Sequence, residues 1–287
     1  MAEQVQTAAE VTLCVLVMGK PGITSECLYS LLNTEYPSYD IAIVNNGHPD
    51  MAPLLLEFQR AAARQRRDCT LIMNSRNVGA ASGRNQVLRL STNPYVAFVD
   101  NDSIVCDPHW LATLVACMES DPVLAAAGPK LLFRNRPTVI QAAGGGVSRS
   151  GCVCDMGRNL PKDSPEYSTG RDVQFLSSAC MLLRSSAASK CGPFDSVFDP
   201  VLFEEIDLCY RMRSLGYRLR YVPDAEILHY ENTTTFGSSE INGRYLFAKH
   251  ARLFKNRWRH VYENEDGPTE DQVRAFNSRS ELGCGGA

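Results

Sequence analysis

The chain has 287 residues, enough for one large domain or two small ones with a substantial core. Its 44% apolar and 21% charged residues match an ordinary soluble protein, and a formal net charge of −3 argues against a nucleic-acid partner. The first apolar run, residues 11–18, is far shorter than the ~20 residues that a membrane helix needs, and no later run reaches that length.

The first 130 residues alternate between two patterns. Short apolar runs predict strands at 11–18, 40–47, 69–75, 95–100 and 122–132. The amphipathic stretches between them predict helices at 22–36, 51–67, 80–90 and 107–120. We expect Asp107 to cap the last of these helices, with Pro108 in its first turn. This alternation predicts an α/β fold with a mostly parallel, Rossmann-like sheet flanked by helices.

The pattern changes after residue 132. Residues 133–175 contain many glycine, serine, proline and arginine residues but few long apolar runs, which predicts hairpins and loops. Regular structure is expected again at 173–188, then as a helix at 203–215 closed by Gly216, and as a strand at 218–223. A basic helical extension is expected at 237–265, whereas residues 1–10 are expected to be disordered and residues 266–287 to form a flexible tail.

Polar residues follow three of the predicted strands. They are Asn45-Asn46, residues 74–77, and Asp100-Asn101-Asp102. Ligands of parallel sheets collect at the carboxyl ends of the strands, where these residues are expected to lie. The two carboxylates of the third group can bind a divalent cation or accept hydrogen bonds from ribose hydroxyls. Asp-Asn-Asp also forms a good turn, so the motif by itself leaves a purely structural role open.

A second acidic group lies in "FEEIDLCYR", residues 203–211. In a helix, Glu205 shares the inward face with Leu208 and Met212, whereas Glu204 and Asp207 lie on a more polar face. The helix dipole is enough to explain Glu204 and Asp207, because both would lie near the helix N-terminus. A carboxylate on the core side is costly unless it is paired or used, so Glu205 is a candidate general base.

Six segments in this order resemble the family 2 glycosyltransferases, which have the GT-A fold, and among them the bacterial rhamnosyltransferase-type enzymes. The resemblance covers residues 11 to 235, most of the chain. The segments are "IAIVNNGHPD", "NSRNVGAASGRNQVL", "VAFVDNDSIV", "IQAAGGGVSRSG", "FLSSACMLLRS" and "FEEIDLCYRMRSLGYRLRYVPDAEILH". Each segment is degenerate, but their joint order and spacing are specific. The resemblance implies a nucleotide-sugar-binding half at 11–132 and an acceptor-binding, catalytic half of the same domain at 133–236.

The same resemblance implies inverting transfer of a sugar from a UDP-, dTDP- or GDP-linked donor to an acceptor hydroxyl. Glu205 would be the base, because it stands where the family usually has the Asp of a Glu-Asp pair. A divalent cation, Mn²⁺ or Mg²⁺, would be bound by Asp102, with Asp100 facing the ribose or the metal shell. His229 matches a position that completes the metal shell in some relatives, although a single histidine is more often structural. The donor nucleotide would be held by Asn45, Asn46, Gly47, Arg76, Asn77, Gly79, Arg84 and Asn101, with Asn85 supporting this wall.

Two departures from the family pattern affect the expected donor site. The family usually has an Asp where Asn45 lies, and an amide donates as well as accepts hydrogen bonds. The first strand ends in "MGKPG" rather than in the usual Tyr-Asn. The donor nucleotide and the role of residues 18–22 are therefore left open.

Partners and location follow less directly. The acceptor, which is a glycan, a lipid-linked sugar or a small molecule, is expected to contact loops at 133–175 and 177–200. The basic stretch 244–262 either lies on a membrane surface or packs on the domain, and a homodimer is left open. Eleven cysteines, many of them in apolar runs, and a start without a positive leader region predict a cytoplasmic protein, peripheral at the inner face if it contacts the membrane.

Two other classes of function remain alternatives at this point. A sugar-phosphate nucleotidyltransferase can share the sheet and the acids, but it would not need "FEEIDLCYR" opposite the Asp-Asn-Asp motif. A catalytically silent nucleotide-sugar-binding subunit would keep the donor loops without using Glu205 as a base.

Overall fold

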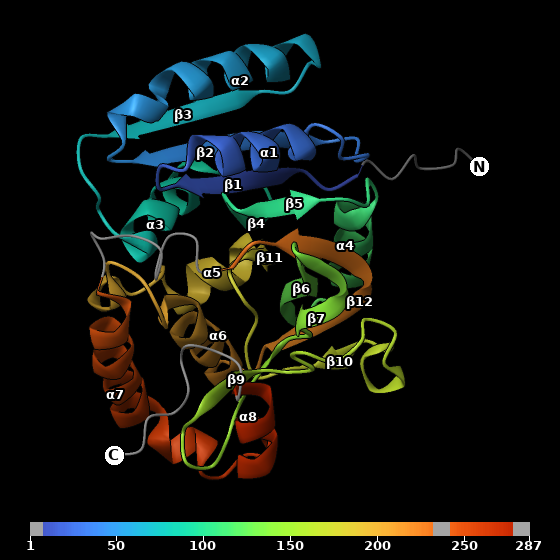
Figure 1. Ribbon diagram of the computed structural model, residues 1–287, viewed down its shortest axis with the longest axis vertical. Helices are drawn as coiled ribbons and strands as arrows, with labels where there is room; N and C mark the ends of the chain where they lie inside the picture. The colour runs from blue at the N-terminus through green and yellow to red at the C-terminus, as the bar shows by residue number, and fades with distance from the viewer. Residues whose placement is uncertain (1–7, 232–241, 278–287) are drawn as a thin grey trace.

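The computed structural model describes residues 8–231 and 242–277. Ten strands of these residues form one sheet with the order β10-β12-β6-β11-β4-β1-β2-β3, in which β5 also pairs with β12 and β7 with β6 (Figure 1). The strands are β1 (Val11–Val17), β2 (Tyr39–Asn46), β3 (Cys69–Asn74), β4 (Tyr95–Asp100), β5 (Ser103–Val105), β6 (Leu124–Phe133), β7 (Arg136–Ala142), β10 (Arg171–Asp172), β11 (Cys180–Arg184) and β12 (Arg218–His229). A separate hairpin consists of β8 (Gly145–Val147) and β9 (Val153–Asp155).

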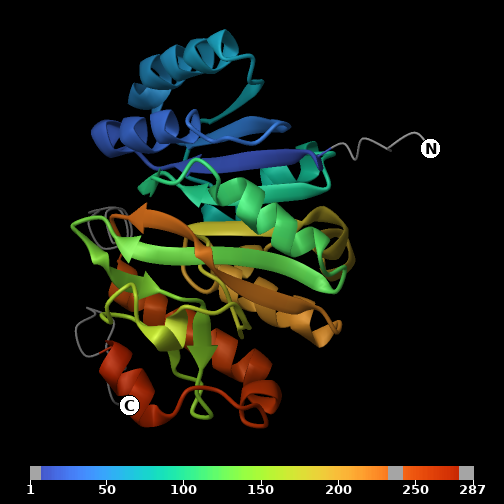
Figure 2. The ribbon, with the colours of Figure 1, turned by 90° about the vertical axis from the view of Figure 1, so that its right-hand side faces the viewer.

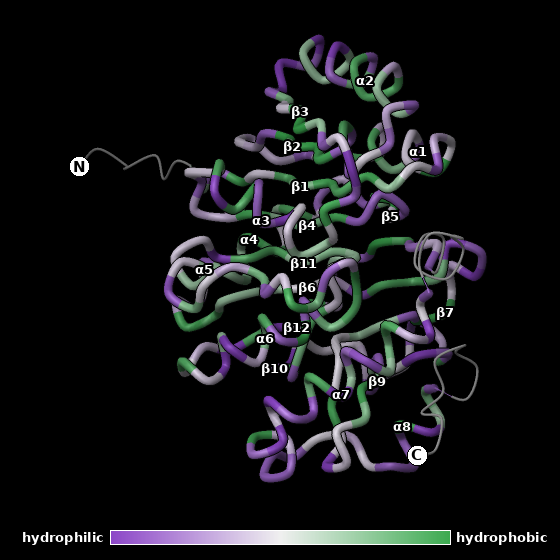
Figure 3. Tube along the Cα trace, turned by 90° about the vertical axis from the view of Figure 1, so that its left-hand side faces the viewer, coloured by the Kyte–Doolittle hydropathy of each residue, from purple (hydrophilic) through white to green (hydrophobic). Residues whose placement is uncertain are grey.

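Helices cover both faces of the sheet. They are α1 (Pro21–Leu31), α2 (Ala52–Arg64), α3 (Ala80–Leu90), α4 (Trp110–Glu119), α5 (Ser185–Cys191), α6 (Glu204–Ser214), α7 (Gly243–Tyr262) and α8 (Glu270–Asn277), with short 3-10 turns at Pro49–Met51, Pro165–Tyr167 and Ser196–Phe198. Strand β1 alternates between two cores: Leu13 and Val15 pack with α1, α2 and α4, whereas Cys14 and Leu16 pack with α3, α5, α6 and α7. Figure 2 shows the layers from the side, and Figure 3 shows hydrophobic stretches along the central strands.

The predicted parallel sheet is confirmed for the first four strands. Strands β3, β2, β1 and β4 are parallel neighbours, and the predicted ranges of α3 and β4 agree with the observed ones. From β11 onward the sheet is mixed, because β11 runs antiparallel to both β4 and β6 while β12 is parallel to β6. The four N-terminal strands are therefore all parallel, whereas the rest of the sheet combines the parallel pair β6–β12 with antiparallel neighbours.

The strand register brings three chain segments to one edge of the sheet. In the parallel half, Leu16 is opposite Asp100 and Val17 is opposite Asn45. The short strand β5, directly after the Asp-Asn-Asp turn, pairs antiparallel with the end of β12, so that Ser103 is opposite His229. A strand more than 100 residues away in sequence thus ends beside the acidic turn. The predicted strand at 218–223 was too short, because β12 continues to His229 to make this pairing.

Two local expectations were wrong. Asp107 does not cap α4, which begins at Trp110 after His109; its Oδ1 accepts a hydrogen bond from the backbone N–H of His109 and closes a turn before the helix. The chain between 270 and 277, expected to be part of a flexible tail, forms α8. Val273 and Phe276 of α8 are buried against the β7–β9 region, and this apolar contact holds the helix in place.

The expected disordered N-terminus, 1–10, and the expected flexible tail, 266–287, lie partly outside the described residues. Residues 1–7 and 278–287 are not described. Within the segment expected to be disordered, the carbonyl of Ala9 accepts a hydrogen bond from the Tyr36 hydroxyl at 2.6 Å, which fixes the chain there. The basic extension expected at 237–265 is described from residue 242, where it forms α7 up to Tyr262.

Helix α7 packs on α6 through every fourth residue. The buried row is Leu246, His250, Phe254, Trp258 and Tyr262. Below it lies Asp207 of α6, which is fully buried and accepts hydrogen bonds from Arg211 Nε, Arg257 Nη1 and Trp258 Nε1 at 2.8 to 2.9 Å. Asp207 was expected on a polar face, which is wrong because α7 covers that face. The buried carboxylate instead joins α7 to α6.

Asp207→Asn is expected to destabilise the fold by roughly 3–5 kcal/mol, because it removes one partner of a buried ion-pair cluster and turns an amide N–H₂ toward arginine donors. The matched control is Asp195→Asn: Asp195 pairs with the same Arg257 at 2.9 Å but is 35% exposed, so its loss should cost at most about 1 kcal/mol. Urea unfolding of both variants measures the difference. Equal losses of stability would contradict the assignment.

Candidate active site

Three groups that could bind a cation meet at the edge of the sheet. Asp100 and Asp102 end β4 and the following turn, and His229 ends β12; one donor atom from each lies within 4.8 Å of the others. His229 Nε2 lies 3.0 Å from Asp102 Oδ1, and His229 Nδ1 lies 2.7 Å from Oε1 of Gln141. His229 and Asp102, which are 127 residues apart in sequence, therefore converge.

The electrostatics of this group favour a bound cation. Burial, followed by the charge of Asp102, raises the pKa of Asp100 even though Arg84 opposes the shift. Burial lowers the pKa of His229, but the charge of Asp102 and its hydrogen bond outweigh this effect and raise the pKa to about 9. Two carboxylates and one imidazole are donors that Mn²⁺ accepts, and a cation would relieve the repulsion between the two acids. The residues present therefore fit a small divalent cation.

Arg84 connects this acidic edge to helix α6. Its side chain is buried, and its Nη2 and Nη1 lie 2.8 Å from Asp100 Oδ1 and 2.7 Å from Glu204 Oε1. Glu204, expected on a polar helix face, is in fact buried, because the side chain of Arg84 reaches it from α3. Arg84 was expected to bind the donor; in the structure both of its Nη groups are engaged by carboxylates, and a contact with the donor stays a prediction.

Glu205 lies at the start of α6 beside a cleft. One of its oxygens, Oε2, is buried and has no hydrogen-bond partner among the described residues. Burial, followed by the charge of neighbouring Glu204, raises the pKa of Glu205 to about 8. A carboxyl group with this pKa is largely protonated at neutral pH and ionises as the pH rises toward 8, and only the ionised form can take up a proton as a general base.

The polar residues after β2 and β3 hold two loops together. Asn45 Nδ2 donates to the carbonyl of His48 at 2.7 Å, a bond that a carboxylate at this position could not make. Asn46 accepts from the N–H of Val78 at 2.9 Å and donates to Asn77 Oδ1 at 3.0 Å. These buried amides shape the wall on which a donor is expected to bind.

Four other residues expected in the donor site show different surroundings. Arg76 and Asn77 are exposed on the loop after β3. Asn101 is buried and donates to the Thr24 hydroxyl at 2.7 Å, and Asn85 exchanges two hydrogen bonds with the backbone of Phe194. Asn101 and Asn85 therefore fix neighbouring segments, whereas Arg76 is exposed, and Asn77 is exposed but accepts from Asn46 through its side-chain oxygen.

Gly47 allows the two donor loops to touch. Its φ is +89°, and a Cβ at this position would lie 2.4 Å from the backbone of Arg76 and Asn77. Gly47→Ala is therefore expected to destabilise the protein by roughly 1–3 kcal/mol and to weaken donor binding. Gly22→Ala is the control, because a Cβ on Gly22 would meet nothing within 4 Å. Thermal unfolding of both variants measures the effect, and an unchanged melting temperature for Gly47→Ala would contradict it.

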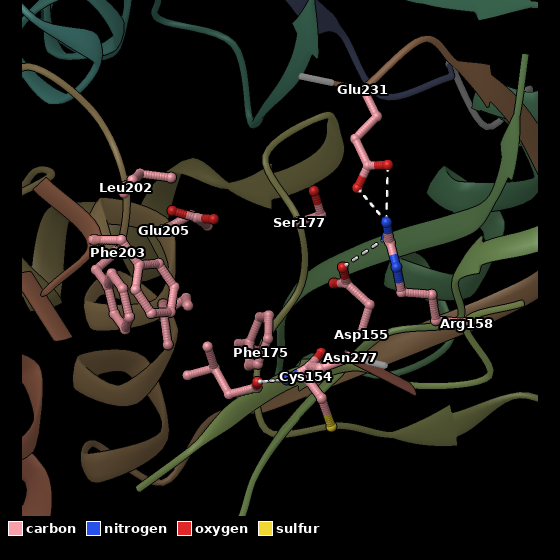
Figure 4. A pocket seen from close by; sticks show the side chains of 13 residues that line it. Cys154, Asp155, Arg158, Phe175, Ser177, Leu202, Phe203, Glu205, Glu231 and Asn277 are labelled. Carbon is pink, nitrogen blue, oxygen red and sulfur yellow. Dashed lines mark hydrogen bonds and ion pairs between the residues drawn. The ribbon is translucent and has the colours of Figure 1, made fainter. Parts of the chain in front are cut away.

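The cleft beside Glu205 was only partly foreseen. Its volume is about 170 Å³, and Glu205 and Phe203 line one side of it (Figure 4). Asp155, Arg158 and Glu231 line the opposite side. Burial raises the pKa of Asp155 to about 6, so its carboxylate is ionised at neutral pH. The sequence analysis expected acceptor loops at 133–175 but did not identify these three residues or Gln141. The charges of Asp155 and Arg158 within a glycine-rich segment could have indicated two of them.

A sequence model of the family described as "Glycosyltransferase like family 2" matches residues 9–248. The chain belongs to glycosyltransferase family 2. This family 2 chain is 30% identical over 166 residues to a pre-mycofactocin glycosyltransferase of Mycobacterium tuberculosis, covering 58% of this chain and 33% of that protein. It is 25% identical over 231 residues to the N-acetylglucosaminyl-diphospho-decaprenol L-rhamnosyltransferase of the same species, covering 71% and 70% of the two chains. The chain thus spans a third or less of the length of the first relatives it matches.

The fold of this family 2 chain is also that of solved glycosyltransferases. A crystal structure of GalNAc-T7 with UDP, GalNAc and Mn²⁺ superposes with a TM-score of 0.65 at 13% identity, covering 95% of this chain and 54% of the other. This likeness identifies the GT-A fold. No helix in the described part of the chain is both long and apolar enough to cross a membrane.

Proposed function

We propose that the chain transfers a sugar from a nucleotide-diphospho-sugar to an acceptor hydroxyl with inversion at the anomeric carbon. The observation that carries the proposal is the position of Glu205. Its carboxylate lines a cleft, has an oxygen without a partner among the described residues, and is linked through Glu204 and Arg84 to Asp100. Membership of glycosyltransferase family 2 supports the same reaction.

In the proposed step, the acceptor oxygen forms a bond to the anomeric carbon while the bond from that carbon to the diphosphate breaks. The electron pair leaves with the nucleoside diphosphate, and the acceptor proton moves to Glu205. One displacement inverts the configuration. Asp100, Asp102 and His229 would hold Mn²⁺ or Mg²⁺, which when bound neutralises charge on the diphosphate. Gln141 accepts a hydrogen bond from His229 Nδ1–H and so directs Nε2 toward Asp102.

The donor nucleotide is proposed to be UDP, dTDP or GDP, held between the loops after β2 and β3. Exposed Arg76 and Asn77 are the side chains there that can reach it, and Asn45, Asn46 and Gly47 fix the loop shape. The amide at Asn45 is already bonded to His48, so it is proposed to act on base recognition through the loop rather than by contact.

The test is metal-dependent turnover of the donor. UDP-, dTDP- and GDP-sugars are screened by thermal shift with Mn²⁺, because a ligand of the folded state raises its melting temperature. The donor that binds is then incubated with Mn²⁺, Mg²⁺ or EDTA. Slow hydrolysis to free sugar and nucleoside diphosphate, lost in EDTA, is expected. Pyrophosphorolysis to a nucleoside triphosphate would instead indicate a nucleotidyltransferase, and binding without turnover a silent binding subunit.

Two proposed partners need separate measurements. Arg244, Lys249 and Arg252 are exposed on α7, and we propose that they contact anionic lipid if the acceptor is lipid-linked. Flotation with anionic liposomes tests this contact: a triple alanine variant that floats as well as the wild type would rule it out.

Homodimer formation is measured by sedimentation velocity. A protein that sediments as a monomer at micromolar concentration would rule out the homodimer.

A further inference from the structure

An ion-paired cluster forms the wall of the cleft opposite Glu205. The Nη2 group of Arg158 lies 2.7 and 2.8 Å from the two carboxylate oxygens of Glu231, and its Nη1 lies 3.5 Å from Asp155 Oδ2. These three side chains come from the β9 turn and from the chain just after β12, and Figure 4 shows them facing Glu205 across the cleft. The β8–β9 hairpin and the end of β12, which carries His229, therefore meet at this cluster.

The charge of this wall is unfavourable for an anion. One guanidinium is shared by two carboxylates, and Glu205 adds a third acid to the same cleft. The side chain of Arg158 is 6% exposed, and its charge is neutralised by Glu231 and Asp155. It is therefore not available to bind an anionic ligand. A phosphate or carboxylate group would face net negative charge here, whereas hydroxyl groups can donate to the carboxylate oxygens.

Much of the remaining wall is apolar, although Ser177 and Asn277 also line it. Phe175 and Phe203 line the cleft, and both are buried. A pyranose ring combines C–H faces, which pack on aromatic side chains, with hydroxyls that need acceptors. A cleft with mostly apolar walls and a few fixed polar groups is typical of a site for a small molecule of this kind.

Backbone strain points independently to the same place. Leu202, Phe203 and Glu231 have φ values of +80°, +75° and +60°, and all three line this cleft. Positive φ is costly for residues other than glycine and collects at functional sites, where surrounding structure enforces it. Three strained residues around one cleft are hard to explain by chain connection alone.

We propose that this cleft is the acceptor subsite and that it selects a neutral sugar, whose hydroxyls donate to Glu231 and Asp155 while Arg158 holds these carboxylates in place. The proposal rests on the proposed glycosyl transfer and adds the chemical class of the acceptor. In the transfer step, the attacking hydroxyl of this sugar gives its proton to Glu205 across the cleft. The cluster orients the sugar and takes no part in bond formation.

The test compares neutral p-nitrophenyl glycosides of common pyranoses with the matching sugar 1-phosphates as acceptors, using the donor that the protein hydrolyses. The wild type should use at least one neutral glycoside about 10-fold or more better in kcat/KM than its phosphate counterpart. Glu231→Gln should raise the acceptor KM by about 10-fold and should change acceptor-free donor hydrolysis by clearly less than this. Glu226→Gln is the matched control, because Glu226 lies on β12 with nearly equal exposure but pairs with Lys162 away from the cleft.

A double variant, Asp155→Asn with Glu231→Gln, tests the charge itself. It leaves Arg158 as the charged member of the cluster, so the preference should shift by about 10-fold or more toward the 1-phosphates. A merely structural cluster would not change selectivity in this way. Preference of the wild type for the phosphates, no transfer to any neutral glycoside, or equal loss of hydrolysis and transfer in Glu231→Gln would overturn the proposal. Absence of donor hydrolysis in the wild type would instead reject the proposed glycosyl transfer.

Discussion

Replacing Glu205 with glutamine is expected to lower the rate of sugar transfer by roughly 10²–10⁴-fold, the usual contribution of a general base, while donor affinity stays within about twofold. The amide keeps the size of the side chain but cannot take up the acceptor proton. Transfer kinetics and donor titration calorimetry separate the two effects. Transfer by Glu205→Gln at nearly the wild-type rate would show that another group is the base.

The same substitution is expected to stabilise the fold. The pKa of Glu205 is about 8 in the folded chain and 4.5 for the free side chain, so folding favours the protonated form. The destabilisation by ionised Glu205 is absent below pH 4.5, grows as the pH rises, and is complete above pH 8. Glu205→Gln should therefore melt several degrees above the wild type at pH 8 and only slightly above it at pH 5. Glu204→Gln is the contrasting neighbour: it weakens the pair with Arg84 and should lower the melting temperature.

The pKa of Glu205 also sets an expected pH dependence of the reaction. Because only the ionised carboxylate can accept the acceptor proton, kcat/KM should rise with pH and level off above about pH 8. Below that pH the rate should fall by about tenfold per unit. A profile from pH 5.5 to 9 at saturating Mn²⁺ measures this, and a flat profile would contradict the assigned role.

Replacing Asp102 with alanine is expected to have the second large effect, a loss of metal-dependent donor binding. Asp102 is buried, lies 3.0 Å from His229 Nε2 and shares the cation group with Asp100. Its removal should weaken donor binding in Mn²⁺ by about 10- to 100-fold or more, to the affinity that the wild type shows in EDTA. Titration calorimetry with and without metal measures the change.

The control for Asp102→Ala is Asp107→Ala. Asp107 is a half-buried acid five residues later whose carboxylate closes a turn and lies outside the cation group. It should leave donor binding unchanged. If Asp102→Ala and the wild type respond equally to Mn²⁺, the cation must be held by other residues.

Local pattern was sufficient for the nucleotide half of the sheet. The apolar run 95–100 agrees with β4, which is bounded by turn residues and buried on both faces. The helical pattern 80–90 agrees with α3, which buries Ala80, Arg84 and Val87 at helical spacing. Helical spacing placed Glu205 on the core side, but Glu205 is only half-buried and lines a cleft. Glu204 and Asp207 were misplaced, because periodicity describes one buried face, whereas Arg84 and α7 bury the opposite side of α6 as well.

The amino-acid sequence alone determined that this chain has an α/β sheet with acids at a strand end, and that Glu205 lies near the start of a helix; both follow from interactions within a few residues. Only the tertiary structure decided which groups meet. The antiparallel pairing of β5 with β12 places His229 beside Asp102, and the chain after β12 brings Glu231 to Arg158. Such contacts depend on strand register and on ion pairs between distant segments. The periodicity of a short stretch of sequence carries no information about either of them.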